Sequence, residues 1–539
     1  MSFKNTPGKT RIVVCDELAP VALEVFRKRG FEPEIRTGMT EDELVEAVVG
    51  VDALVVRSAT KITRRVFEAS DRLKVVGRAG VGVDNVDCVA ATERGVVVMN
   101  TPTGNSTTTA ELAIALMCSL ARHIPRANAI VRGGSWKKKN LVGTELTGKT
   151  LGVVGLGRIG RIVADRGLGL RMKVVGYDPY LQADSSPVAG VDLLELDELL
   201  KVCDFVSLHI PLTDSTRNLI SWERISLMKK GARLINASRG GVVDEEAIVD
   251  ALDEGRLAGA AFDVLADEPP TADHPLVSRD DVIVTPHLGA SSTEAQLTVA
   301  IDVATQISDF LLEGVAMNAV NAPAMKPEVL HELAPFLLLA ERLGRFLAQR
   351  IQGPIRKVEF TVGGDIAKHD LKHLKLAFLV GALRTNLTEG DVNFVNAPGL
   401  AKERGMRVLT SIEDAPIYRL GQIKVRASMR GGSLSHLVMG TVFGRELRFV
   451  RVDGVHLDLK PSGTILITRH RNEPGVVGML GTILGEAGIN IQRIELDPPN
   501  EEIDDLASGF LSLDDQPSPD VLEKISGLDV IEQAQVIRL

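Results

Sequence analysis

The segment that most constrains this chain is GVVGLGRIGRIVADR at residues 152–166, where three glycines have the spacing G-x-G-x-x-G. It follows an apolar run that predicts a strand, and it opens a stretch that predicts a helix. Glycines with this spacing allow a tight turn and let the backbone approach a pyrophosphate, which then meets the positive end of the helix. We therefore predict a Rossmann-type dinucleotide site whose loop consists of Gly155, Gly157, Arg158, Ile159 and Gly160.

Asp178 ends the strand KVVGYD, 18 residues after Gly160. A carboxylate at this position accepts hydrogen bonds from the adenosine ribose hydroxyls and repels a 2′-phosphate, so we expect NAD rather than NADP. The alternative is a tight strand–helix turn that binds nothing. This alternative does not explain why Asp178 follows the three glycines at the spacing that is typical of a dinucleotide site.

The overall composition excludes several classes of protein. A chain of 539 residues is too long for one core and should form three or four domains. Its net charge of −9 argues against a nucleic-acid or membrane-surface partner, and no apolar run is long enough for a membrane span. We expect a cytoplasmic protein without a bound metal, because its four cysteines are scattered: Cys15, Cys88, Cys118 and Cys203.

The order of the apolar runs indicates a discontinuous first domain. Strands and helices alternate over the first 100 residues, which predicts a parallel sheet without a glycine-rich loop. A long helix is predicted after Asn100 and another after His287, with a complete second set of strands between them. We expect the nucleotide unit to be inserted into the first domain, with a cleft between the two lobes. Two consecutive domains without a return crossing are the alternative.

The C-terminal part has a different character. NAPAMKPE, from residue 321, reads as a linker, and residues 321–460 predict an α+β domain without a recognisable site. Residues 463–539 predict the order βαββαβ of a ferredoxin-like sandwich. The expected fold class is therefore α/β, with two Rossmann-like parallel-sheet lobes, one of them discontinuous, followed by an α+β domain and a βαββαβ domain.

Three polar side chains follow strands of the nucleotide unit, at the edge where ligands bind in open α/β sheets: Arg239, Glu268 and His287. Oxidation of a secondary alcohol requires a base, a role that histidine fills at neutral pH, and a carboxylate behind the imidazole would fix its tautomer. Arginine matches the carboxylate of a 2-hydroxy acid with two parallel hydrogen bonds. Taken singly, these residues could instead be a surface ion pair, an exposed turn carboxylate and a helix cap.

The segments NASRGGVVDE, DVLADEPP and TPHLGASS resemble the signatures of the D-isomer-specific 2-hydroxyacid dehydrogenases. The resemblance covers residues 10–320. It implies that Arg239, Glu268 and His287 are catalytic, that the imidazole is buried, and that Asp263 contacts the nicotinamide amide. It also implies a substrate-binding domain of residues 1–101 and 287–320 and an NAD-binding domain of residues 102–286.

VRSATKIT and GRAGVGVDNVD resemble the members of that family that act on 3-phospho-D-glycerate. This resemblance implies a substrate phosphate held by local cations, which an acidic protein needs. A solvated surface position is the alternative for Arg132 and Lys137. The implied substrate-binding set is Arg57, Ser58, Arg78, Gly80, Arg132 and Lys137.

HRNEPGVVGMLGTILGEAGINI resembles an ACT domain, a regulatory module for small ligands. The resemblance implies that His470, Asn472 and Asn490 bind L-serine across a dimer interface, in a homo-oligomer that is a dimer or a tetramer. Amide and imidazole groups suit a zwitterion because they can donate and accept hydrogen bonds. Alternatively, Asn490 merely turns the chain and His470 merely ends a strand.

Together these features give the hypothesis of an NAD-dependent enzyme that oxidises 3-phospho-D-glycerate to 3-phosphohydroxypyruvate. This is the first step of L-serine biosynthesis, and serine would regulate it through residues 463–539. A glyoxylate/hydroxypyruvate reductase is the alternative enzyme, but it gives no reason for the C-terminal extension. An NAD-sensing corepressor-like scaffold is the alternative from another class.

Overall fold

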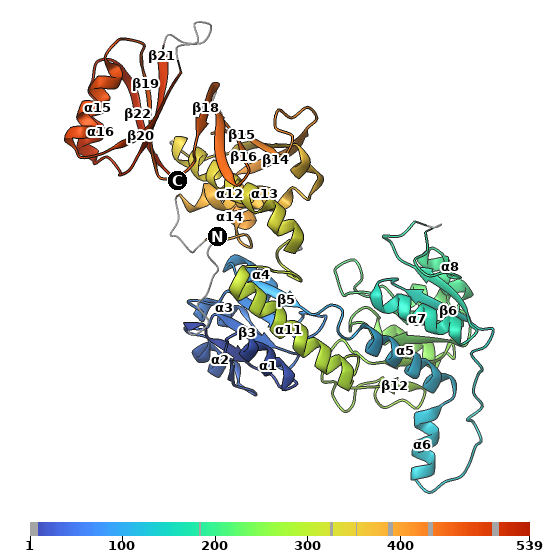
Figure 1. The fold of residues 1–539 in the computed structure, drawn as a ribbon. Coiled ribbons are helices and arrows are strands. Elements are labelled where there is room, and N and C mark those ends of the chain that lie inside the picture. The colour runs from blue at the N-terminus through green and yellow to red at the C-terminus, as the bar shows by residue number, and fades with distance from the viewer. Residues whose placement is uncertain are drawn as a thin grey trace.

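The described part of the chain forms four sheets, each of which gathers its own helices (Figure 1). The computed structural model describes residues 9–182, 185–323, 327–351, 353–385, 392–429, 435–497 and 506–539. The first two sheets are entirely parallel, the third is largely antiparallel and the fourth entirely so. The predicted fold class is confirmed. Within the described residues, no helix combines the length and apolar character that a membrane crossing requires.

The first lobe is built on the sheet β2-β1-β3-β4-β5. Its central strands are buried on both faces because helices cover both sides, α1 and α11 on one and α2, α3 and α4 on the other. The elements are β1 (Ile12–Val14), α1 (Val21–Lys28), β2 (Glu34–Ile35), α2 (Glu41–Ala47), β3 (Ala53–Val56), α3 (Arg64–Ala69), β4 (Val75–Arg78), α4 (Cys88–Glu93), β5 (Val97–Asn100) and α11 (Thr293–Glu313).

The second lobe is built on the sheet β12-β11-β10-β9-β6-β7-β8, whose strand order reverses beside β6. Helices α5 and α7 cover one face and α8, α9 and α10 the other, while α6 projects from the lobe with no buried residue (Figure 1). The elements are α5 (Ser106–Ala121), α6 (Ile124–Arg132), β6 (Thr150–Val154), α7 (Arg158–Gly169), β7 (Lys173–Tyr177), β8 (Asp192–Leu193), α8 (Leu196–Val202), β9 (Phe205–Leu208), α9 (Trp222–Leu227), β10 (Ala232–Asn236), α10 (Glu245–Asp253), β11 (Leu257–Phe262) and β12 (Val282–Val284).

The chain enters the second lobe through α5 and returns to the first through α11. The N-terminal ends of these two helices touch, with Thr108 Oγ1 2.9 Å from Ser292 Oγ. Helix α11 packs so closely on β4 that a Cβ on Gly77 would lie 2.4 Å from Ile307 Cδ1. Residues 12–99 and α11 therefore share one hydrophobic core, although the whole second lobe separates them in the sequence.

The third unit follows the first lobe and continues into the fourth. Helices α12 and α13 pack on the third sheet, β14-β13-β15-β16-β17-β18, and α15 and α16 cover one face of the fourth, β20-β21-β19-β22. The other face of the fourth sheet packs into the core of the third unit through Ile467 and Phe510. The elements are α12 (Pro327–Arg350), β13 (Lys357–Gly363), a 3-10 helix (Asp365–Lys368), α13 (Lys372–Arg384), α14 (Ala397–Glu403), β14 (Arg407–Glu413), β15 (Gln422–Ser428), β16 (Ser435–Phe443), β17 (Glu446–Val452), β18 (Val455–Leu459), β19 (Thr464–Arg471), α15 (Val476–Glu486), β20 (Ile491–Asp497), β21 (Leu506–Leu513), α16 (Pro519–Ser526) and β22 (Ile531–Arg538).

Candidate active site

A cleft of about 1170 Å³ lies between the two lobes. Its second-lobe wall is formed by loops that follow β9, β10, β11 and β12, which all end at the same edge of the parallel sheet, together with Ile159 of α7. The sequence-predicted residues that line the cleft are Arg57, Ser58, Arg78, Ile159, Arg239, Asp263, Glu268 and His287.

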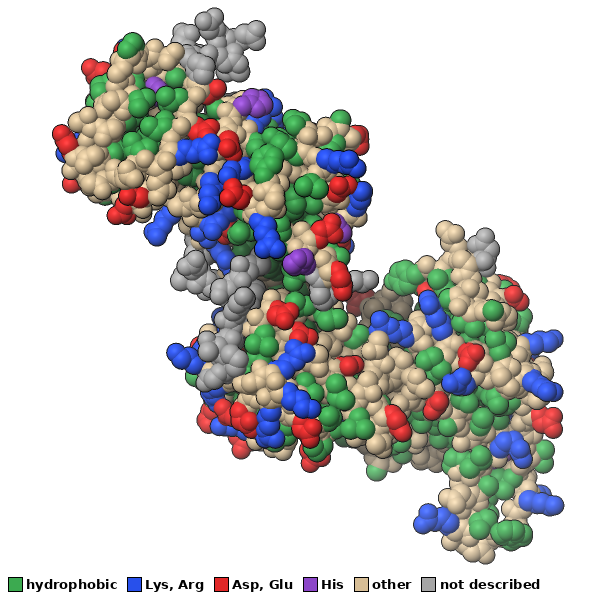
Figure 2. Space-filling model, viewed as in Figure 1, with side chains coloured by type: hydrophobic (Ala, Val, Ile, Leu, Met, Phe, Trp, Pro, Cys, Tyr) green, Lys and Arg blue, Asp and Glu red, His purple; other side chains and the backbone are tan. Residues whose placement is uncertain are grey.

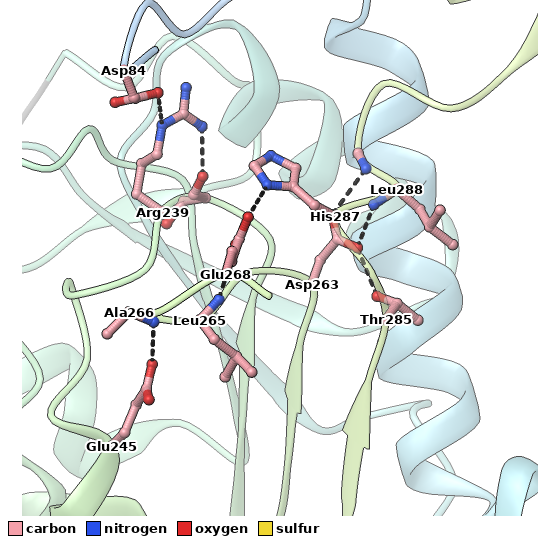
Figure 3. A network of polar contacts seen from close by, with 12 residues as sticks. Asp84, Arg239, Glu245, Asp263, Leu265, Ala266, Glu268, Thr285, His287 and Leu288 are labelled. Atoms are coloured by element: carbon pink, nitrogen blue, oxygen red, sulfur yellow. Dashed lines mark hydrogen bonds and ion pairs between the residues drawn. The ribbon is translucent and has the colours of Figure 1, made fainter. Parts of the chain in front are cut away.

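His287 and Glu268 face each other across the loops after β12 and β11 (Figure 3). Glu268 Oε2 lies 2.8 Å from His287 Nδ1, so this nitrogen carries the proton of the neutral ring and Nε2 is left as the acceptor. The expectation of a buried imidazole is wrong, because 48% of the His287 side chain is exposed. The side chain projects into the open cleft and not into the core of either lobe.

Asp263 holds the backbone that presents His287. The His287 backbone has φ 54°, a left-handed conformation that is uncommon outside glycine. Asp263 accepts hydrogen bonds from Leu288 N (2.7 Å), Gly289 N (2.8 Å) and Thr285 Oγ1 (2.6 Å), while its own carbonyl accepts from His287 N (3.0 Å). Burial raises the pKa of Asp263, and these donors oppose the rise. The Asp263 carboxylate therefore fixes the His287 loop.

Arg239 stands beside the pair of His287 and Glu268 on the same wall of the cleft and links the lobes (Figure 3). Its Nε lies 3.1 Å from Asp84 Oδ2 of the first lobe, and its Nη1 donates to Ser238 O at 2.7 Å. A second guanidinium, that of the half-buried Arg78, lies nearby, and desolvation followed by the charge of Arg239 lowers its pKa to about 10. A Cβ on Gly80 would overlap the Arg78 guanidinium. Two neighbouring cations in one cleft favour an anionic ligand.

The glycine-rich turn has the shape that a dinucleotide requires. Gly155 has φ 92°, and a Cβ there would lie 2.5 Å from His209 O. A Cβ on Gly160 would lie 1.8 Å from Gly155 O, so the turn cannot accommodate side chains at either position. A Cβ on Gly157 would meet nothing within 4 Å, which leaves open space at the N-terminal end of α7. Asp178 Oδ2 accepts a hydrogen bond from Leu156 N at 2.9 Å, which joins the end of β7 to this turn.

Three buried polar atoms of cleft residues have no hydrogen-bond partner in the described structure: Arg78 Nε, Asn105 Oδ1 and His209 Nδ1. Unpaired buried polar atoms are costly, so their presence in one cleft fits a polar ligand such as NAD. His209 bonds Ser207 Oγ through Nε2 at 2.8 Å, and burial lowers its pKa to about 3, which keeps the ring neutral. Asp84, Asn105 and His209 were not among the predicted site residues, although Asn105 comes shortly after a predicted strand and His209 lies within one.

Other predicted residues lie apart from the cleft. Arg132 ends α6 and Lys137 follows it, both exposed, and neither lines the cleft of this chain. Helix α6 projects from the second lobe (Figure 1), so this chain does not bring the two residues to its own cleft, and their role in the substrate site stays a prediction. In the fourth unit His470 is buried while Asn472 and Asn490 are exposed. Among the described hydrogen bonds, none joins any two of these three residues.

Family models match three successive parts of the chain. Residues 114–289 match the NAD binding domain of D-isomer specific 2-hydroxyacid dehydrogenases, residues 332–453 the D-3-phosphoglycerate dehydrogenase intervening domain, and residues 464–529 the ACT domain. With the glycine turn and the cleft, the first match defines the class: the chain is an NAD-dependent dehydrogenase of D-2-hydroxy acids.

Full-length relatives narrow this class to a single family. D-3-phosphoglycerate dehydrogenase of Methanocaldococcus jannaschii is 42% identical over 98% of this chain and 100% of its own length. The enzyme of that name from Synechocystis is 41% identical over 98% of this chain and 95% of its own length. The chain therefore belongs to the D-3-phosphoglycerate dehydrogenases.

Solved structures of other dehydrogenases share part of the fold. A glyoxylate reductase from Paecilomyes thermophila is 27% identical with a TM-score of 0.54, and it covers 58% of this chain and 98% of its own. The pyruvate reductase of Chlamydomonas reinhardtii is 31% identical with a TM-score of 0.51, and it covers 57% of this chain and 98% of its own. Both similarities extend over little more than half of this chain.

Proposed function

We propose that this chain oxidises 3-phospho-D-glycerate to 3-phosphohydroxypyruvate with NAD, the first step of L-serine biosynthesis. The proposal depends above all on the 2.8 Å contact between His287 Nδ1 and Glu268 Oε2 in a cleft that also presents Arg239. This contact leaves His287 Nε2 as a base at the end of the parallel sheet. The names of the full-length relatives supply the substrate.

In the proposed reaction, His287 Nε2 takes the hydroxyl proton of the substrate while the carbonyl forms. Glu268 stabilises the imidazolium that results, because the carboxylate is already bonded to Nδ1. Arg239 binds the substrate carboxylate next to the reacting carbon and polarises the developing carbonyl. The glycine turn and Asp178 would hold NAD, whose nicotinamide would supply the hydride acceptor. Binding of the substrate carboxylate must therefore compete with Asp84 for Arg239.

The phosphate of the substrate is assigned to the first-lobe cations. Arg57 and Ser58 follow β3, Arg78 ends β4, and all three line the cleft. Arg78 is half-buried, and its pKa of about 10 keeps it charged at neutral pH, so a phosphate would neutralise a guanidinium that is only partly solvated. This charge pairing favours a phosphorylated substrate over glyoxylate, which carries one carboxylate and no phosphate.

We also propose that the chain acts as a homo-oligomer. The α6 arm, residues 124–142, exposes large apolar side chains, and Figure 2 shows hydrophobic side chains among basic ones on this projection. Exposed apolar groups gathered on one projection favour burial against a second copy of the chain. Sedimentation velocity tests this, since a monomer at micromolar concentration would contradict it. The exposed apolar residues of the arm are Ile124, Val131, Trp136 and Val142.

We propose that residues 463–539 regulate the enzyme by binding L-serine through His470, Asn472 and Asn490. Burial lowers the pKa of His470, which favours the neutral imidazole, and Nδ1 already contacts Thr468 Oγ1 at 3.3 Å, so Nε2 is the nitrogen proposed to meet the ligand. The two asparagines are exposed and accessible to a ligand shared with a second copy.

We also propose a division of the chain into domains that consist of residues 1–101 with 287–320, 102–286, 321–460 and 463–539. The four free cysteines agree with a cytoplasmic location, which is likewise proposed.

The decisive experiment measures NADH formation with 3-phospho-D-glycerate across a serine titration. We expect turnover with this substrate, no comparable turnover of glyoxylate in the reverse direction, and a loss of about 10²–10⁴ in kcat for His287→Gln with NAD affinity retained. Activity with glyoxylate alone would reject the substrate. Equal loss of kcat and NAD affinity in His287→Gln would reject the role of the base.

A further inference from the structure

The loop that carries Glu268 is closed by a second carboxylate. Glu245, the first residue of α10, extends toward this loop (Figure 3) and accepts a hydrogen bond from Ala266 N at its Oε1, 2.7 Å away. Its other oxygen, Oε2, lies 3.2 Å from His274 Nε2. Ala266 and His274 stand on either side of Glu268 in the sequence, so one carboxylate joins both ends of the segment that presents Glu268.

The hydrogen bonds of His274 define its tautomer. Leu276 N donates to His274 Nδ1 at 3.3 Å, so Nδ1 is the acceptor. Nε2 therefore carries the hydrogen and donates a hydrogen bond to Glu245. Both side chains are largely removed from solvent, with 17% of His274 and 16% of Glu245 exposed. Hydrogen bonds to a shielded carboxylate are stronger than those at an open surface.

The peptide between Leu265 and Ala266 transmits this constraint to the catalytic pair. Its N–H is the donor to Glu245, and its carbonyl oxygen lies where a Cβ on Gly240 would be only 1.9 Å away. On the adjoining peptide, Leu265 N donates to Glu268 Oε1 at 3.1 Å, while Glu268 Oε2 contacts His287. The backbone that Glu245 holds is therefore the one that orients the carboxylate behind the imidazole.

Capping of α10 does not explain Glu245. Asp244 already caps this helix by accepting from Ala247 N at 3.2 Å. Glu246, the next residue, offers the same charge to the first turn of the helix but is exposed. Only Glu245 among these three acidic residues reaches the loop that follows β11.

We propose that Glu245, together with His274, is a positioning residue for the dehydrogenase reaction. It acts through Glu268 by fixing the 266–274 loop, and it touches neither substrate nor cofactor. The inference rests on the proposed roles of Glu268 and His287. A loop released from Glu245 lets the Glu268 carboxylate move away from His287 Nδ1, which weakens stabilisation of the imidazolium formed during the reaction. Ground-state binding of NAD is left unchanged.

The test compares four variants of the full-length protein: Glu245→Ala, Glu245→Gln, His274→Gln and the matched control Glu246→Ala. For Glu245→Ala we expect kcat to fall roughly tenfold while KM for NAD is unchanged. This loss is smaller than the roughly 10²-fold that a 1 Å displacement of a catalytic group costs. Glu245→Gln keeps an acceptor for Ala266 N and should recover most of the loss. His274→Gln keeps a donor for Glu245 and should lose no more than about threefold, and Glu246→Ala should match the unmodified protein.

A double-mutant cycle separates positioning from general damage. If Glu245 acts through Glu268, adding Glu245→Ala to Glu268→Gln produces no further loss of kcat, whereas a structural defect would add to it. Additive losses, or equal kcat values for Glu245→Ala and Glu246→Ala, would overturn the proposal. An unchanged kcat in Glu268→Gln alone would instead overturn the proposed catalytic pair. Thermal unfolding of each variant identifies any that is poorly folded, and Glu245→Gln then decides the question.

Discussion

A methyl group at Gly240 would collide with the loop that carries Glu268. Its Cβ would lie 1.9 Å from Leu265 O, where real Cβ contacts are at least 3.0 Å, so the Leu265–Ala266 peptide must move by about 1.1 Å. The neighbouring N–H of Leu265 holds Glu268, so the carboxylate behind His287 must shift with it. A displacement of about 1 Å in a catalytic group costs on the order of 10²-fold in rate, or about 2.7 kcal/mol in the barrier.

Initial rates of NADH formation from 3-phospho-D-glycerate measure this effect. We expect Gly240→Ala to lower kcat by about 10²-fold while the affinity for NADH, followed by its fluorescence, stays within a factor of about three. Gly169→Ala in the same lobe is the matched control, because a Cβ there meets nothing within 4 Å and the residue has no positive φ. A Gly240→Ala protein with nearly full kcat would refute the reasoning, since it would show that the loop can move without harm.

Three other expectations follow from the structure. Asp178→Ser removes the carboxylate beside the turn, so activity with NADP should rise relative to NAD in a comparison of kcat/KM values. Burial lowers the pKa of His209 from 6.5 to about 3. Between these two pH values the unfolded state binds more protons than the folded state, so stability that is present above pH 6.5 is lost as the pH falls. Urea unfolding followed by tryptophan fluorescence should therefore show less acid sensitivity in His209→Asn, by at most about 1.4 kcal/mol per pH unit. Gly77→Ala should destabilise the first lobe by roughly 1–3 kcal/mol in calorimetry, and the added change Ile307→Val should restore part of the loss, because it opens space at this contact.

The strands of the two lobes could be predicted because their sequences are continuous apolar runs. Such runs are typical of parallel strands buried on both faces, as in β3 and β9. The two-residue strands β2 and β8 were not predicted, since two residues carry no periodicity. In the third unit the sequence predicted an α+β domain but not most of its individual strands, because members such as β14 are exposed along most of their length and lack an apolar pattern.

The site was predictable where it depends on local sequence. Glu268 and His287 come together because adjacent parallel strands end at one edge, and this follows from strand order. The pairing of Arg239 with Asp84 depends on how two lobes meet, and no local pattern specifies that geometry. Arg132 was assigned to the substrate site from its charge and resemblance alone, whereas the direction of α6 decides its position.

The return of α11 to the first lobe has a consequence for synthesis of the protein. The core of that lobe is incomplete until Val299, Val303 and Ile307 are present, and these are made only after the entire second lobe. On the ribosome, the nucleotide unit can therefore fold while β1 to β5 still lack a covering helix. The strands β1 to β5 are translated first, but their core is complete only after α11 has been made. Until then their apolar surface is exposed and can be bound by a chaperone.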